Sequence, residues 1–133
     1  MEMKRNIDSI RAVLLYLEDN LKIGNPVSSH TVSEEILRKE GCTFGFEDDI
    51  LYAIKQLYDS EMIDANIVNY TMSDFPNYFI KDIRPAGHDF LENIHNNEIW
   101  EKTKAKASKV GSFSIQIIGA IAKQLVLESL HLL

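Results

Sequence analysis

Metal-ligating residues are sparse in this chain of 133 residues. The candidate ligands are one cysteine and four histidines: Cys42, His30, His88, His95 and His131. A structural metal site needs several ligands clustered at a fixed spacing. His88 and His95 lie seven residues apart, and no further histidine or cysteine stands at the i+4 position that would complete a pair on a helix. We therefore expect no metal site.

Patterns typical of catalysis are also missing from the sequence. It contains no Gly-x-Ser-x-Gly motif, and its six glycines are too scattered to form a phosphate-binding loop. The acidic pairs Glu34-Glu35 and Asp48-Asp49 fall in the first turns of predicted helices, where the helix dipole accounts for acidic side chains. We expect no catalytic residue, no cofactor and no enzymatic activity.

Contacts with nucleic acid are the chemistry that the sequence supports best. A helix predicted from about Glu47 to Ser60 should turn a polar face outward, made of Asp48, Tyr52, Lys55, Gln56 and Asp59. On that face Lys55 and Gln56 could read base edges, and Tyr52 could reach a phosphate.

The charge of the same stretch opposes this interpretation. Residues 47–61 hold five acidic side chains and one lysine. Phosphate groups would be repelled by such a surface, so a protein partner is the alternative.

Positive charge is concentrated near the end of the chain. The net charge of −6 divides into −8 for residues 1–97 and +2 for residues 98–133. A second set of candidate nucleic-acid contacts is therefore Lys102, Lys104, Lys106 and Lys109, on a helix predicted from about Glu98 to Gly111. The same lysines could instead face solvent or meet the acidic body of another copy.

The elements that must position these residues follow from periodicity and turn signals. The apolar stripe Ile7, Ile10, Leu14, Leu17 and Leu21 predicts a first helix, which Gly24-Asn25-Pro26 would end. A very short strand at 27–29 precedes a second helix, for which Thr31 and Glu34 form a predicted capping box. The helix at 47–60 follows.

A hairpin and further helices complete the predicted fold. Strands near 62–70 and 78–83 flank a cluster of turn residues, and Pro85 fits the first turn of the next helix. The fold class is mainly α with a small β-hairpin (α+β), in the element order of a winged helix-turn-helix followed by C-terminal helices. We expect a winged-helix-like domain over residues 1–95 and a helical extension over 96–133 that packs on it.

The last predicted helix, from about Phe113, has an apolar arc wider than one face. We expect this arc to form a homodimer interface, through Ile118, Ile121, Leu125 and Leu132, and the alternative is packing of the helix within its own chain. Lys123 and Glu128 interrupt the apolar run, which argues against a membrane span.

Four short motifs resemble a family of small bacterial proteins. They are Lys4-Arg5 followed by Ile10-Arg11, Tyr52-x-Ile54-Lys55-x-Leu57, Gly87-His88-Asp89-Phe90-Leu91 and Trp100-Glu101-Lys102-Thr103-Lys104. The sequence resembles a bacterial and phage-associated family of unknown function, found in prophage-encoded proteins. The resemblance implies a winged-helix-like fold and a phage setting, and it implies no activity.

The sequence thus predicts a cytoplasmic winged-helix protein that binds duplex DNA in a regulatory role. A single cysteine fits a reducing compartment, because it cannot form a disulfide within the chain. The alternative is a non-catalytic protein–protein interaction module on the same scaffold.

Overall fold

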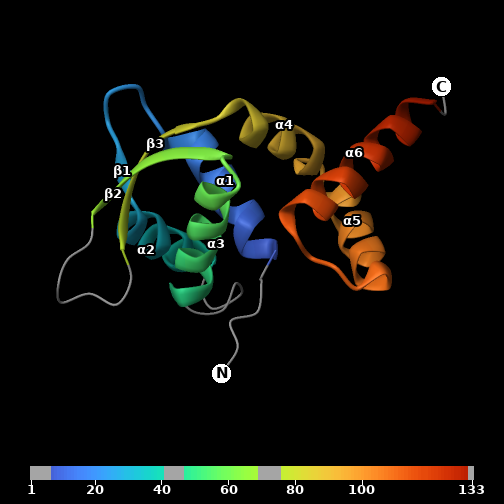
Figure 1. Cartoon of the computed structure of the whole chain (residues 1–133), viewed down its shortest axis with the longest axis horizontal. Helices are drawn as coiled ribbons and strands as arrows, with labels where there is room; N and C mark the ends of the chain where they lie inside the picture. The colour runs from blue at the N-terminus through green and yellow to red at the C-terminus, as the bar shows by residue number, and fades with distance from the viewer. Residues whose placement is uncertain (1–6, 41–46, 69–75, 132–133) are drawn as a thin grey trace. The chain divides into compact units, whose positions relative to one another are not determined.

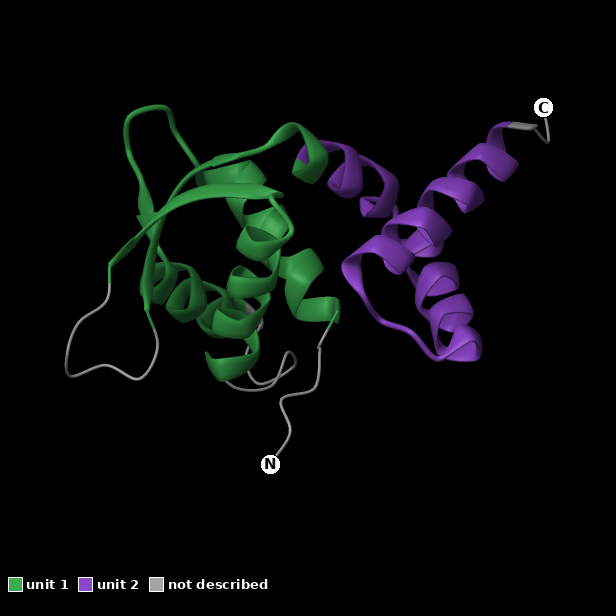
Figure 2. Ribbon diagram, viewed as in Figure 1, with its two compact units in different colours: residues 1–87 green, residues 88–133 purple. Residues whose placement is uncertain are grey.

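The computed structural model of the chain describes residues 7–40, 47–68 and 76–131 (Figure 1). Over these residues the protein is mainly helical and carries one small three-stranded antiparallel sheet. The predicted α+β class is confirmed at this level. The chain divides into two compact units, Met1–Gly87 and His88–Leu133 (Figure 2).

The first unit contains three helices and the sheet within the described ranges. In chain order its elements are α1 (Ile7–Asn20), β1 (Val27–Ser28), α2 (Ser29–Glu40), α3 (Glu47–Asp59), β2 (Ile63–Val68) and β3 (Asn77–Ile83). The strand order is β1-β3-β2, so β3 is central and both neighbours run antiparallel to it. The hairpin predicted from sequence is thereby extended by a two-residue strand from much earlier in the chain.

The core of the first unit is built from the predicted apolar stripes. The stripe of α1 is confirmed from Ile7 to Leu17, because these residues are buried where α1 packs against α2 and α3. Side chains that are at most 2% exposed in this core include Ile10, Leu14, Leu17, Ile50, Ile54, Leu57 and Ile80. Burial of these aliphatic groups holds the outer face of α3 in a fixed orientation.

The start of α2 differs from the predicted capping box. The helix begins at Ser29, and the backbone N–H of Thr31 donates a 3.2 Å hydrogen bond to Oγ of Ser28. Ser28 is therefore the capping residue, and the assignment of Thr31 to that role is wrong. The reason is that the last residue of β1 also supplies the cap, so strand and helix follow each other directly.

The second unit is helical over its described residues. It takes in most of α4 (Pro85–Ile94), together with α5 (Asn97–Val110) and α6 (Ile115–His131). Oδ1 of Asn96 accepts a 3.0 Å hydrogen bond from the backbone N–H of Ile99, and Gly111 ends α5 with a φ of 80°. The end at Gly111 was predicted from the sequence, whereas the cap at Asn96 is a finding of the structure, and α5 packs against α6. Among the described helices, none is long and apolar enough to cross a membrane.

Candidate functional site

The outer side of α3 is acidic. Glu47, Asp48 and Asp49 occupy its first turn, where they complement the helix dipole, and Asp59 ends the helix. The lysine of this helix, Lys55, donates from Nζ to Oδ2 of Asp59 at 2.7 Å. This hydrogen bond and the charge of Asp59 raise the pKa of Lys55 above its usual value. Lys55 therefore has a carboxylate partner on its own helix, and about half of each side chain is exposed.

Gln56 does not belong to the outer side of α3. Its side chain is 8% exposed, so the expectation that it points outward beside Lys55 is wrong. It lies one turn after the buried Ala53, and the buried side of the helix is wider than the stripe of Ile50, Ile54 and Leu57. Its Oε1 atom has no hydrogen-bond partner among the described residues. A side chain held this way cannot reach a base edge.

Tyr52 and Lys55 are half-buried, and these two predicted contact residues do lie together on α3. Glu47 is exposed at the start of the same helix, with its Oε1 3.5 Å from Nδ1 of His30. The groups that α3 offers to a partner are therefore a phenol, a paired lysine and several carboxylates.

The lysines of α5 fall into two kinds. Lys104 is 26% exposed, lies 3.2 Å from a carboxylate oxygen of Glu101 and stands over the ring of Trp100, 5.9 Å from its centroid. These contacts hold Lys104 against its own unit. Lys102 is 60% exposed and pairs with Glu98, one turn earlier, at 3.4 Å.

Lys106 and Lys109 are exposed in the last two turns of α5. Within the described parts of the chain, neither has an ion-pair partner. Lys106 and Lys109 are exposed because Trp100, Thr103 and Ala107 are the buried residues of α5, which leaves another side of the helix in solvent.

The residues predicted to form a dimer interface are placed differently from one another. Ile118 and Leu125 are buried in the chain itself, Ile121 is half-buried, and Leu132 lies outside the described residues. The large apolar residues that α6 leaves exposed are Ile117, Leu127 and Leu130. The homodimer stays a prediction, and it would have to use this second set.

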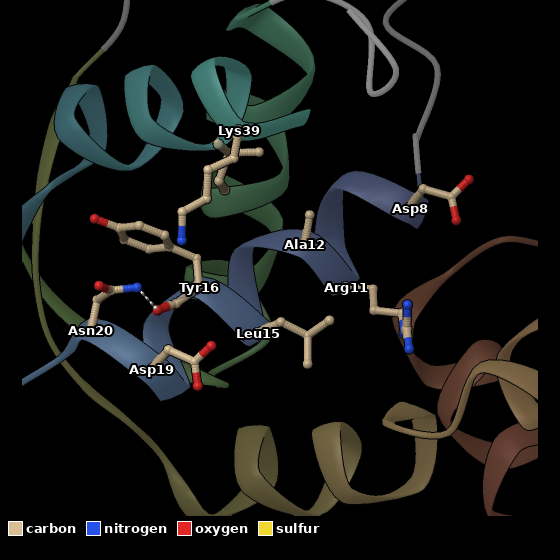
Figure 3. A pocket seen from close by; sticks show the side chains of 9 residues that line it. Asp8, Arg11, Ala12, Leu15, Tyr16, Asp19, Asn20 and Lys39 are labelled. Carbon is tan, nitrogen blue, oxygen red and sulfur yellow. Dashed lines mark hydrogen bonds between the residues drawn. The ribbon is translucent and has the colours of Figure 1, made fainter. Parts of the chain in front are cut away.

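A pocket of about 330 Å³ lies between α1 and α2 in the first unit (Figure 3). Its lining combines apolar and charged side chains: Asp8, Arg11, Ala12, Leu15, Tyr16, Asp19, Asn20, Ile36 and Lys39. Sequence patterns do not reveal this pocket, because it depends on how two helices pack. The available signal was the pair Leu15-Tyr16, which adds apolar surface beside the main stripe of α1.

Tyr16 is the polar group that stands out in this pocket. Its hydroxyl donates to Oε2 of Glu35. Burial, followed by this hydrogen bond and the charge of Glu35, raises the pKa of Tyr16 to about 12. The hydroxyl therefore stays protonated at neutral pH and serves as a donor. No cluster of three or more metal-ligating side chains occurs in the described ranges.

Fold and surfaces together define a mainly helical α+β protein with an acidic helix in one unit and a lysine-rich helix in the other. The chain belongs to the family described as "Hypothetical protein (DUF2513)", which matches residues 4–114. The predicted resemblance to a family of unknown function is thereby confirmed.

A relative extends the similarity over nearly the whole chain. The chain is 28% identical over 130 residues to a protein of Haemophilus influenzae (strain ATCC 51907 / DSM 11121 / KW20 / Rd) named "Uncharacterized protein". The aligned part covers 96% of this chain and 99% of that protein. No solved structure matches the chain.

Proposed function

We propose that the first unit is a winged helix-turn-helix and that the protein binds duplex DNA in a regulatory role. The observation that carries the proposal is topological. The elements run α1, β1, α2, α3, β2, β3, and β1 pairs with β3 to give the sheet order β1-β3-β2. In helix-turn-helix proteins the second helix of the pair lies in the major groove, which is the role this order would give α3.

The side chains of α3 give this DNA binding little sequence selectivity. Tyr52 and Lys55 can approach DNA, but Lys55 is paired with Asp59 and the buried Gln56 is withdrawn from base readout. Binding would then depend mainly on contacts between lysines and phosphates, which salt weakens.

A mobility-shift titration with labelled duplex DNA tests the proposal. We expect micromolar protein to shift the duplex at about 50 mM salt, and the affinity to fall steeply towards about 200 mM. No shift at the lower salt concentration would overturn it.

A phage or prophage setting is part of the same proposal. It is supported by the resemblance that Gly87-His88-Asp89-Phe90-Leu91 and Trp100-Glu101-Lys102-Thr103-Lys104 carry. The single cysteine supports a place in the cytoplasm.

The acidic side of α3 favours a second candidate function, a non-catalytic protein-interaction module. Glu47, Asp48 and Asp59 are exposed on this helix, and such carboxylates complement a basic surface of a protein partner. Titration calorimetry with a lysine- and arginine-rich peptide tests this candidate.

We expect binding to the protein and its loss in the double variant Asp48→Asn, Asp59→Asn. Equal binding by both proteins would contradict the candidate. The same variant in the DNA assay separates the two functions, because removing carboxylates strengthens DNA binding wherever α3 lies near phosphates.

A further inference from the structure

We infer that the phosphate-contacting surface is on α5: three lysines, Lys102, Lys106 and Lys109, form a row that binds the backbone of duplex DNA. This inference rests on the DNA binding proposed above and names the surface responsible for it. The three residues are hereafter called the α5 lysine row.

The spacing of the α5 lysine row places its members on one side of the helix. Positions i, i+4 and i+7 recur on a single face, and this face is distinct from the one that buries Trp100, Thr103 and Ala107. At 1.5 Å per residue the row spans about 10 Å. B-DNA carries one phosphate charge per roughly 1.7 Å of axis, so about six phosphates lie along such a length.

The ion pairing of the row leaves its charge available. Lys106 and Lys109 have no carboxylate partner within the described residues, and both are exposed. Lys102 pairs with Glu98 at 3.4 Å, but both side chains are more than half exposed. An exposed pair of this kind is weak and can be exchanged for a phosphate.

Small side chains flank the α5 lysine row. Ala105 and Ser108 are exposed in the same two turns of α5. They add no bulk that would hold the helix away from a DNA backbone, and a close approach strengthens each contact between ammonium and phosphate.

The contrast with α3 decides between the two helices. Lys55 of α3 lies 2.7 Å from Asp59, and the exposed Glu47 and Asp48 add negative charge beside it. Lys104 of α5 is likewise held, by Glu101 and Trp100, and is not counted in the row. Among the described parts of these two helices, the α5 lysine row is therefore the surface that complements phosphate.

Two triple variants test the inference. The first replaces the row, K102Q/K106Q/K109Q, and the second replaces three exposed lysines elsewhere, K22Q/K81Q/K123Q. Both lower the net charge by the same amount, so a general effect of charge is matched. Glutamine keeps a high helix propensity, and circular dichroism confirms that each variant is folded.

The measurement is the dependence of the DNA association constant on salt for the full chain. Each lost phosphate contact reduces the slope of log K against log salt by roughly 0.9. We expect the row variant to lose most of the wild-type slope and roughly tenfold or more in affinity at low salt, while the control stays near wild type. Glu98→Gln, which releases Lys102, should raise the affinity.

Three results would overturn the inference in distinguishable ways. If wild type binds DNA and the row variant behaves like the control, the surface is wrong while the proposed function stands. If wild type binds no duplex at about 50 mM salt, the proposed function itself fails. If the row variant loses only a salt-dependent self-association seen in wild type, the row contacts the acidic surface of another copy.

Discussion

Ser29 donates a 2.9 Å hydrogen bond from its hydroxyl to Oδ1 of Asn77, which joins the start of α2 to the start of β3. The same hydroxyl oxygen accepts a 3.1 Å hydrogen bond from the backbone N–H of Tyr78. All three residues are buried, so these groups have no access to water in exchange. The hydroxyl of Ser29 therefore holds the start of α2 against β3 of the sheet.

Replacing Ser29 with alanine should destabilise the first unit. The change leaves the amide oxygen of Asn77 and the N–H of Tyr78 buried without this partner, which costs about 1–3 kcal/mol. Urea unfolding followed by circular dichroism measures the loss, with Ser108→Ala at an exposed position of α5 as the control. Equal stability of the two variants would contradict the role given to Ser29.

Gly87 is required by a close approach of the chain at the start of α4. A Cβ atom built on this residue would lie 2.1 Å from the carbonyl oxygen of Met62 and 2.8 Å from Cγ2 of Ile83. The carbonyl cannot move away easily, because it accepts a 2.9 Å hydrogen bond from the backbone N–H of Arg84. The glycine thus allows the helix to begin directly beside the hairpin.

We expect Gly87→Ala to destabilise the protein by about 2 kcal/mol or more, because an added methyl group in a filled site forces the backbone to shift. Thermal unfolding gives the measurement, and Ala86→Ser, at an exposed neighbour in the same turn, is the control. A melting temperature unchanged from wild type would show that the backbone yields at little cost.

Local signals explain which parts of the fold could be predicted. Pro85 and Gly111 act through their own backbone preferences, so they marked the start of α4 and the end of α5 without knowledge of the packing. The start of α2 was misplaced because Ser28 and Thr31 are both suitable caps. The choice between them depends on the pairing of β1 with β3, which is distant in sequence.

The candidate site was less predictable because it depends on how much of the circumference of α3 and α5 is buried. Spacing alone places Gln56 on the outer side of α3 beside Lys55. In the structure Gln56 lies on the same side of α3 as the buried Ala53 and is itself buried. The separation of Lys104 from its neighbours on α5 depends likewise on the ring of Trp100. Such effects belong to packing and leave no mark in hydrophobic periodicity.

Tyr16 should make stability fall at alkaline pH. Its pKa is raised from 10.0 to about 12 in the folded protein, so folding favours the protonated phenol. That contribution is fully present below pH 10 and is lost as the pH rises towards 12, since the unfolded chain then releases its proton first.

The corresponding variant is Tyr16→Phe, which lacks this ionisation. Between pH 10 and pH 12 wild type should lose on the order of 1–2 kcal/mol that the variant does not lose. Unfolding free energies measured across this pH range test the prediction, and Tyr52→Phe, on the outer side of α3, is the control. Parallel pH profiles for Tyr16→Phe and wild type would contradict it.

The exposed apolar residues of α6 give the predicted homodimer a specific form. Ile117 and Leu127 remain exposed, whereas Ile118 is buried and its replacement would unfold the unit instead of testing an interface. We expect light scattering at high micromolar concentration to give twice the chain mass of 15.2 kDa for wild type, because pairing would cover these side chains. The double variant Ile117→Ser, Leu127→Ser should give the single-chain mass, and Ile67→Ser, at an exposed apolar site of β2, should stay dimeric. A wild-type mass of one chain would contradict the dimer.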